Sequence, residues 1–188
     1  MKLFDQHTIP ELLGERFSVR MRFVEPRDAS FILKLRTDER LGKFISPTEN
    51  DLEKQIKWIR QYKSREQKSE EFYFLFESLS GKPYGVSRAY NFCEDSFEIG
   101  SWLFSHDTPE GVAILADLAT RDYAFISRNV SACKFEVRKA NRNVIRYHQR
   151  FNPEVICEDN ENYYFRLSFE KYIKFRNNLI AVYNHGTR

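Results

Sequence analysis

The chain lacks the features that mark disulfide-rich, zinc-binding and membrane-spanning proteins. Its three cysteines are odd in number and share no C-x-x-C spacing, so neither a disulfide framework nor a metal site is expected, and the thiols are predicted to be reduced and in the core. No run of about 18 apolar residues occurs, which excludes a membrane-spanning helix. The first ten residues lack the apolar run of a signal peptide, so a cytoplasmic location is predicted.

Neither sign of charge dominates. The 30 Lys and Arg residues exceed the 27 Asp and Glu residues by only three and are scattered among them, which is too small an excess for a nucleic-acid-binding or membrane-binding surface. Repeats, low-complexity tracts and flexible linkers are also missing. What is present is 41% hydrophobic residues, 15% aromatic residues and 30% charged residues. This composition is typical of one globular domain with a sizeable core.

The spacing of apolar residues predicts a particular order of strands and helices. A strand (17–24), a short helix that starts at Pro26, and a loop (37–47) precede a helix expected to begin at a Thr48-Glu49-Asn50-Asp51 capping box. Strands at 72–78, 84–92 and 96–104, a helix at 109–128, a strand at 133–137, a helix at 141–151 and strands at 154–157 and 163–168 follow. The order predicts an α/β fold, a mixed and mostly antiparallel sheet of about seven strands with four or more helices on its faces.

The domain is expected to span residues 18–170. An N-terminal extension (1–17) precedes it, and a partly helical C-terminal tail (171–188) follows. Tyr172, Phe175 and Tyr183 in the tail either pack a dimer or complete the core, so a monomer and a homodimer both remain open.

The segment from Phe97 to Ala113 has the features of a phosphate-binding site. A strand that ends in Leu103 and Phe104 runs through a short loop into a helix that starts near Gly111. The first amides of a helix are unpaired and lie at the positive end of its dipole, so they bind anions such as a pyrophosphate. Gly111 and Ala113 carry no side chain large enough to block these amides. In the alternative interpretation, Gly111 is an ordinary glycine near a helix start.

A second informative segment follows, one helix and one strand later. Residues 135–152 combine a strand, Asn141, and a helix that contains Tyr147 and His148. The two segments in this order resemble the GNAT superfamily of acyl-CoA-dependent N-acyltransferases, over residues 18–169. The segment 108–113 is similar to the family motif Gln/Arg-x-x-Gly-x-Gly/Ala but lacks the leading Gln or Arg, which predicts weaker CoA binding. The resemblance implies acetyl-CoA as co-substrate, bound by Leu103, Phe104, Thr108, Pro109, Glu110, Gly111, Val112, Ala113 and Asn141.

The same resemblance implies roles for three further residues. His148 stands where most relatives have the Tyr that protonates the leaving thiolate of CoA, and Tyr147 is the alternative acid. Adjacent residues on a helix diverge by about 100°, so only one of them can face the thioester. Glu98 is expected to take a proton from the acceptor amine through water, or else to be structural or to orient the substrate. The Asn141 side chain is expected to contact pantetheine, to cap the helix, or to do both.

The acceptor is expected to contact the loop after the first helix and the third strand, which border the acyl end in this fold. The residues concerned are Arg36, Phe44, Ser46, Arg88, Tyr90 and Asn91. The segments Leu35-Arg36-Thr37-Asp38 and Ile45-Ser46-Pro47, followed by a helix with Gln55 and Trp58, resemble the GNAT branch that acts on amino-sugar nucleotides. Arg36 or Arg88 would then bind a diphosphate bidentately, or would be a surface ion-pair partner.

The predicted function is acetyl transfer from acetyl-CoA to the primary amine of a small molecule, such as a nucleotide-linked amino sugar. Two alternatives remain: acetylation of a protein N-terminus or lysine, and non-catalytic binding of acyl-CoA. No nucleic acid, membrane or metal is expected as a partner.

Overall fold

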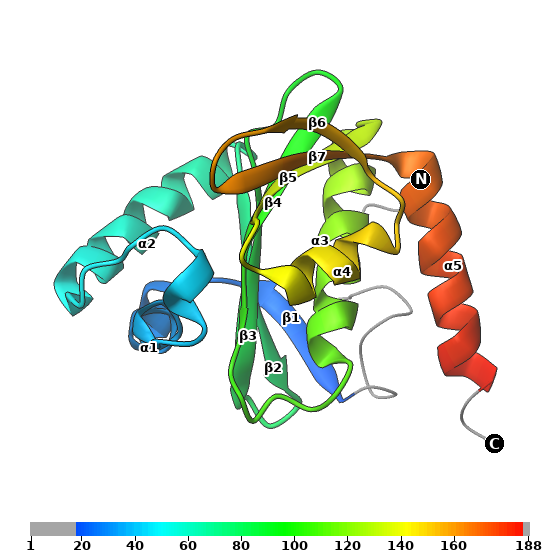
Figure 1. Cartoon of the computed structure of the whole chain (residues 1–188). Helices are drawn as coiled ribbons and strands as arrows, with labels where there is room; N and C mark the ends of the chain where they lie inside the picture. Colours follow the sequence, from blue (N-terminus) through cyan, green and yellow to red (C-terminus); the bar gives the residue numbers. More distant parts are fainter. Residues whose placement is uncertain (1–17, 186–188) are drawn as a thin grey trace.

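The computed structural model describes residues 18–185, which form a seven-stranded sheet with helices against both faces (Figure 1). The strands are β1 (Val19–Phe23), β2 (Phe72–Ser78), β3 (Pro83–Tyr90), β4 (Ser96–Phe104), β5 (Ala132–Arg138), β6 (Glu154–Glu158) and β7 (Asn162–Ser168). The helices are α1 (Ala29–Thr37), α2 (Leu52–Gln67), α3 (Val112–Arg128), α4 (Arg142–Gln149) and α5 (Phe169–His185), with 3-10 turns η1 (Pro26–Asp28) and η2 (Gly42–Phe44). The predicted fold class is confirmed. None of the helices among these residues is long and apolar enough to cross a membrane.

Strand β2 explains why the sheet is covered on both faces. Its residues from Phe72 to Phe76 are all buried, although successive side chains of a strand point to opposite faces. Phe72, Phe74 and Phe76 join the core that includes α3, whereas Tyr73 and Leu75 join the core of α1 and α2. Each such buried side chain contributes about 2 kcal/mol. The sheet therefore separates two hydrophobic cores, with α1 and α2 on one side and α3 and α4 on the other (Figure 1).

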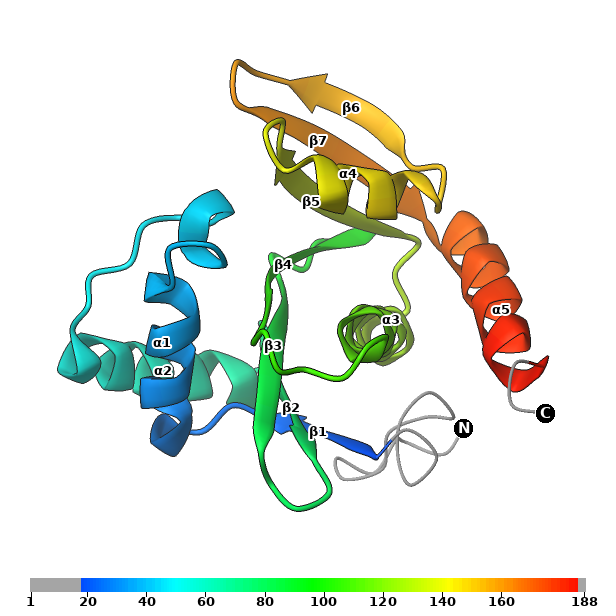
Figure 2. The ribbon, with the colours of Figure 1, turned by 60° about the horizontal axis from the view of Figure 1, so that its bottom comes forward.

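The sheet is split between its two parallel strands. The strand order is β1-β2-β3-β4-β5-β7-β6, and β4 and β5 are its parallel pair. They are paired only from Ser96 to Glu98 on β4 and from Ala132 to Lys134 on β5. Beyond these residues the strands diverge, as Figure 2 shows. The divergence opens a gap between the first four strands and the β5-β7-β6 unit.

Strand β4 carries a β-bulge beside this gap. Ser101 and Trp102 stand opposite a single residue of β3, between the pairs Leu103↔Val86 and Gly100↔Arg88. Ser101 has a φ of 49°, a left-handed conformation that is uncommon outside glycine. Bulges of this kind bend a strand and redirect its side chains. The bend lies at the residues of β4 that face the gap.

Helix α2 begins one turn later than the sequence pattern predicted. The side chain of Asp51 caps it by accepting a hydrogen bond from Lys54 N at 3.0 Å. The Thr48 hydroxyl instead accepts a hydrogen bond from Arg36 Nε at 2.7 Å. Aspartate is at least as good an N-cap as threonine, and Asp51 lies directly before the first helical residue. The capping box expected at Thr48 is therefore wrong.

Two of the three cysteines also differ from the expectation. Cys133 is buried on β5, whereas Cys93 and Cys157 are exposed. Cys93 lies in the turn between β3 and β4, and Cys157 lies on the edge strand β6. The prediction of core thiols is therefore wrong for these two residues.

The tail beyond residue 170 continues as α5. Tyr172 is fully buried, and its hydroxyl lies within hydrogen-bond distance of Asp122 Oδ1 at 2.6 Å and Leu118 O at 2.8 Å. Phe175 packs on Phe151 with ring centroids 4.1 Å apart. These two aromatics complete the core, while the Tyr183 side chain and residues 1–17 lie outside the described residues.

Candidate active site

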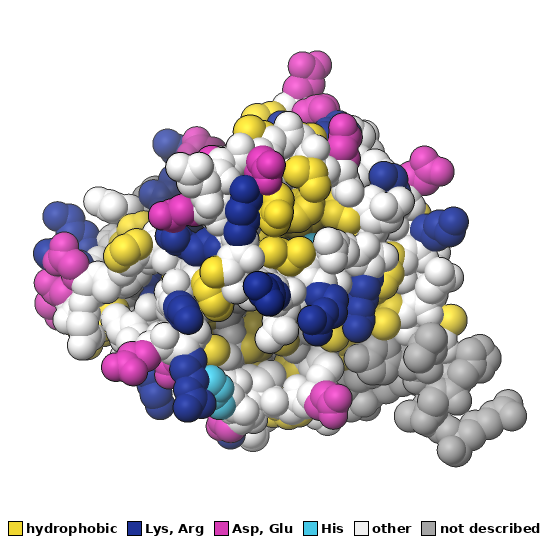
Figure 3. Space-filling model, in the orientation of Figure 1, with side chains coloured by type: hydrophobic (Ala, Val, Ile, Leu, Met, Phe, Trp, Pro, Cys, Tyr) yellow, Lys and Arg dark blue, Asp and Glu magenta, His cyan; other side chains and the backbone are white. Residues whose placement is uncertain are grey.

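Two cavities meet at the gap between β4 and β5. The α2-side cavity, of about 550 Å³, is bounded by α1, α2 and the residues around η2. The α4-side cavity, of about 380 Å³, is bounded by α3, α4 and the inner edge of β5. They share the wall residues Phe44, Ile45, Ile99, Gly100, Ser101, Glu136, Arg138 and Asn162. The face seen in Figure 3 is hollowed at its centre, with Lys and Arg side chains around the hollow.

The first turn of α3 presents free main-chain donors. Gly111 is the N-cap residue and adopts φ 83°, the left-handed region that favours glycine. Among the described residues, the amides of Gly111, Ala113 and Ile114 have no acceptor, because the first hydrogen bonds of this turn come from the Val112 and Leu115 amides. Such a turn is a ready anion site.

Strand β4 is tied to this turn by one hydrogen bond. Trp102 Nε1 donates to Ala113 O at 2.9 Å. Of the residues expected at CoA, Leu103, Phe104, Ala113 and Asn141 line the α4-side cavity, whereas Thr108, Pro109, Glu110, Gly111 and Val112 form the turn beside it. Asn141 also caps α4, because its side chain accepts from Val144 N at 3.4 Å. Asn141 therefore both caps α4 and lies in the wall of the α4-side cavity.

Helix α4 turns its two candidate acids in different directions. His148 lines the α4-side cavity. Tyr147 stacks on Trp102, with centroids 5.1 Å apart, and its hydroxyl donates to Asp117 Oδ2 at 2.8 Å. Burial and the Asp117 charge raise the pKa of Tyr147 well above its usual value. Tyr147 is therefore committed to the interior, and His148 is the member of the pair that faces the cavity.

His148 is held in its neutral form. Its side chain is 5% exposed, and its Nδ1 has no hydrogen-bond partner among the described residues. Burial, together with the charge of Arg121, lowers its pKa to about 3. At neutral pH the ring therefore carries one N–H donor and no charge.

A buried ion pair lies beneath this helix. Arg121 Nε donates to both carboxylate oxygens of Asp117 at 3.0–3.1 Å, and neither side chain is more than 1% exposed. Arg121 also contacts Cys133 Sγ at 3.1 Å and lies over the ring of Phe135. Although burial opposes its charge, Asp117 holds the pKa of Arg121 above the ordinary value. The pair links α3 to the wall of the α4-side cavity.

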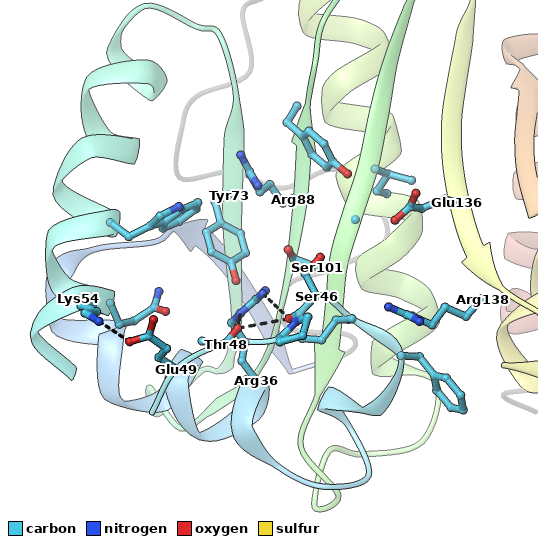
Figure 4. A pocket seen from close by; sticks show the side chains of 18 of the residues that line it. Arg36, Ser46, Thr48, Glu49, Lys54, Tyr73, Arg88, Ser101, Glu136 and Arg138 are labelled. Atoms are coloured by element: carbon cyan, nitrogen blue, oxygen red, sulfur yellow. Dashed lines mark hydrogen bonds and ion pairs between the residues drawn. The ribbon is translucent and has the colours of Figure 1, made fainter. Parts of the chain in front are cut away.

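The two arginines predicted to bind the acceptor both line the α2-side cavity, but they differ in their ion pairing. Arg88 is paired with Glu71 through Nε at 3.2 Å and Nη2 at 2.6 Å, and its guanidinium lies over Trp58. Arg36 donates to the Thr48 hydroxyl and to Ser46 O, and has no carboxylate partner among the described residues (Figure 4). Arg36 is thus the arginine whose charge is available to a ligand.

The remaining predicted residues divide between the cavity and its surroundings. Phe44, Ser46 and Tyr90 line the α2-side cavity, whereas Asn91 is exposed beyond the end of β3 and does not. Glu98 lies in the part of β4 that is still paired with β5, next to Tyr90 in the register, and lines neither cavity. Burial and the charge of Glu98 raise the pKa of Tyr90 to about 12.

Sequence reasoning did not single out Glu136, Arg138 or Tyr73. Glu136 and Arg138 line both cavities, and Tyr73 lines the α2-side cavity. The alternation of residues 133–137 could have placed Glu136 on the polar side of β5, but not beside the gap. Among the described residues, no group of three or more His, Cys, Asp or Glu side chains is arranged to hold a metal ion.

Known proteins share this fold. A family model described as "Acetyltransferase (GNAT) domain" matches residues 18–152. Apo FdhC, described as a nucleotide-linked sugar GNAT, is 32% identical with a TM-score of 0.78, covering 87% of this chain and 93% of that chain. Campylobacter jejuni N-acetyltransferase PseH is 23% identical (TM-score 0.60, coverage 81% and 99%). Vibrio cholerae spermidine N-acetyltransferase is 15% identical (TM-score 0.68, coverage 83% and 98%). Among curated protein sequences, none matches.

The family match and the likeness to FdhC show that this protein is an acyl-CoA-dependent N-acyltransferase. The chain belongs to the GNAT acetyltransferase family, because the family model covers residues 18–152 and FdhC shares 32% identity over almost all of its length. Acetyl-CoA is accordingly its co-substrate.

Proposed function

We propose that this enzyme transfers the acetyl group of acetyl-CoA directly to the primary amine of a nucleotide-linked amino sugar. The observation that carries the proposal is the pair of cavities that share the wall at Gly100 and Ser101, one next to open helix amides and the other containing Arg36. Direct transfer requires both substrates to meet at one point. The shared wall offers that meeting point.

On the donor side, the amides that open α3 bind the pyrophosphate of CoA, and the thioester arm lies in the α4-side cavity. Attack of the amine nitrogen forms the C–N bond and breaks the C–S bond, and the proton that the nitrogen then loses passes to the thiolate. His148 lines the cavity that holds the sulfur. As a neutral imidazole, it stabilises the leaving thiolate by donating its N–H, with Tyr147 holding α4 against Asp117.

On the acceptor side, the charges favour an anionic molecule that carries one amine. Of the four basic residues that line the α2-side cavity, Lys54, Arg88 and Arg138 are each paired with a carboxylate, and among the described residues Arg36 is not. Arg36 supplies a planar donor fork that suits a diphosphate. The relationship to FdhC, a nucleotide-linked sugar GNAT at 32% identity, also supports this acceptor class.

A panel of amines tests the acceptor. Thiol release from acetyl-CoA is measured with uridine- and thymidine-diphosphate-linked amino sugars, the free amino sugars, spermidine, and a peptide with an N-terminal alanine. We expect the nucleotide-linked sugars to have a kcat/KM roughly 100-fold above that of the free sugars, because they gain charge-assisted hydrogen bonds. A preference for spermidine or the peptide would contradict the proposal.

Within the panel, Arg36→Met is expected to raise the KM for the nucleotide-linked sugar roughly 10- to 100-fold, because one charge-assisted contact is lost. The KM for acetyl-CoA should not change. The control is Arg60→Met, an exposed residue of α2 that lines neither cavity. If both variants behave alike, Arg36 does not contact the acceptor.

Gly111→Ala is expected to weaken acetyl-CoA binding roughly 10-fold in a calorimetric titration. A left-handed φ costs a residue with a Cβ about 1–2 kcal/mol, and relief of that strain turns the amides away from the phosphates. Gly81→Ala is the matched control, because Gly81 has a similar φ of 88° in the β2–β3 turn. It should lose similar stability but keep its affinity for acetyl-CoA. Equal affinities for both variants would remove α3 from the donor site.

A further inference from the structure

We propose that Glu136 is the catalytic residue that binds the acceptor's ammonium group and takes its proton before acetyl transfer. This inference rests on the proposed function and adds the identity of the proton acceptor, for which Glu98 was the candidate from sequence. It is carried by the position of Glu136 in the wall shared by the two cavities and by the lack of any hydrogen-bond or ion-pair partner for it within residues 18–185.

Glu136 lies on β5 just beyond Lys134, the last residue paired with β4. The side chain lines both cavities and is exposed. In Figure 4 its carboxylate points from β5 across the gap toward the strand that carries Ser101. Among the described residues it has no hydrogen bond or ion pair, so both oxygens are available to a ligand.

The other carboxylates near the gap are engaged elsewhere or lie outside it. Glu49 is paired with Lys54, and Asp51 caps α2. Asp117 is buried between Arg121 and Tyr147. Glu98 lines neither cavity, as described above. Glu136 is therefore the one carboxylate, among the described residues, that lines both cavities and has no partner.

The local charges favour an ammonium group at this position. Arg138, the neighbouring cation of the shared wall, is paired with Glu161 at 2.6 Å, so it does not neutralise Glu136. Arg36 and Glu136 line the same α2-side cavity, so one acceptor can present its diphosphate to Arg36 and its amine to Glu136.

The proton balance is complete without a further reactant. The acceptor arrives as R–NH3⁺, and Glu136 accepts one proton and passes it to solvent. The resulting amine attacks the thioester carbonyl, the C–N bond forms, and the C–S bond breaks. The second proton of the nitrogen goes to the CoA thiolate. The products are the amide, CoA–SH and one proton released to solvent.

The test is Glu136→Gln, which keeps the shape of the side chain and removes its charge. With the best amine of the panel, kcat/KM should fall about 100-fold or more at pH 7, while acetyl-CoA affinity and melting temperature stay as in the wild type. The deficit should shrink above the pKa of the acceptor amine, because the free amine no longer needs a proton acceptor. A merely structural role would not produce this pH dependence. Glu94→Gln, in the exposed β3–β4 turn, is the control and should retain full activity.

The outcomes separate the two proposals. Wild-type turnover of nucleotide-linked sugars with an unchanged Glu136→Gln rate overturns the assignment of Glu136 and leaves the proposed function standing. A large loss in Glu98→Gln with none in Glu136→Gln moves the role to Glu98. If the wild type prefers another amine, the acceptor class is wrong and the same comparison tests Glu136 on that amine. A wild type that is inert toward every amine overturns both.

Discussion

Replacing Asp117 with alanine is expected to lower the free energy of unfolding by about 3–5 kcal/mol. The change leaves the Arg121 guanidinium, 0% exposed, without its counter-ion in a low-dielectric interior. It also removes the acceptor of the Tyr147 hydroxyl. A domain of this kind is stable by only about 5–15 kcal/mol, so the variant loses a large part of its stability.

Urea unfolding of the wild type and Asp117→Ala measures this loss. Glu161→Ala is the matched control, because it breaks the ion pair of Arg138 with a carboxylate that is 68% exposed. An exposed pair contributes at most about 1 kcal/mol. Arg121→Met in the Asp117→Ala background should recover part of the loss, since it removes the uncompensated charge. A loss for Asp117→Ala no larger than the control would mean that the pair is not buried as described.

The second large effect concerns His148, which is expected to make the free energy of unfolding depend on pH. Its folded-state pKa of about 3 lies below the unfolded value near 6.5. Between these two values the unfolded chain binds a proton that the folded chain does not, so the contribution of His148 to stability is present above pH 6.5 and is lost as the pH falls toward 3. From pH 8 to pH 5 the expected loss is about 2 kcal/mol.

His148→Phe isolates this contribution, because phenylalanine keeps a ring among Phe135, Trp102 and Phe151 but does not titrate. The drop in unfolding free energy between pH 8 and pH 5 should be about 2 kcal/mol smaller in the variant than in the wild type. The exposed His106, replaced by glutamine, serves as the control for the removal of a surface histidine. An equal drop in wild type and His148→Phe would show that the imidazole titrates normally.

The fold could be predicted from the sequence because periodicity depends on local residues. The alternation of residues 133–137 and the apolar stripe of α3 give each element its type, and the order of elements then limits the topology. Asn141 could also be placed, because a helix cap is a local signal. The glycine at the start of α3 belongs to the same class of local signals, and its left-handed φ explains why glycine stands there.

The side-chain partners within the site could not be predicted, because they depend on contacts between distant segments. Arg88 on β3 is held by Glu71, which lies 17 residues earlier, directly before β2. The choice of Asp51 over Thr48 as cap depends on Arg36, which binds Thr48 from another helix. Glu136 is one of several charged residues on β5. It faces the gap because β4 and β5 diverge just before it, and the sequence does not show where they diverge.

The divergence of β4 and β5 also bears on how far relatives can change in sequence. From Ile99 onward β4 has a strand partner on one edge only, and β5 beyond Lys134 has β7 alone. The inner edges therefore leave main-chain N–H and C=O groups facing the gap, and every residue type except proline supplies both. A ligand bound to these groups requires no particular side chain at either edge, so such binding depends on the topology rather than on residue type. The Vibrio cholerae spermidine N-acetyltransferase has this fold at a TM-score of 0.68 with only 15% identity.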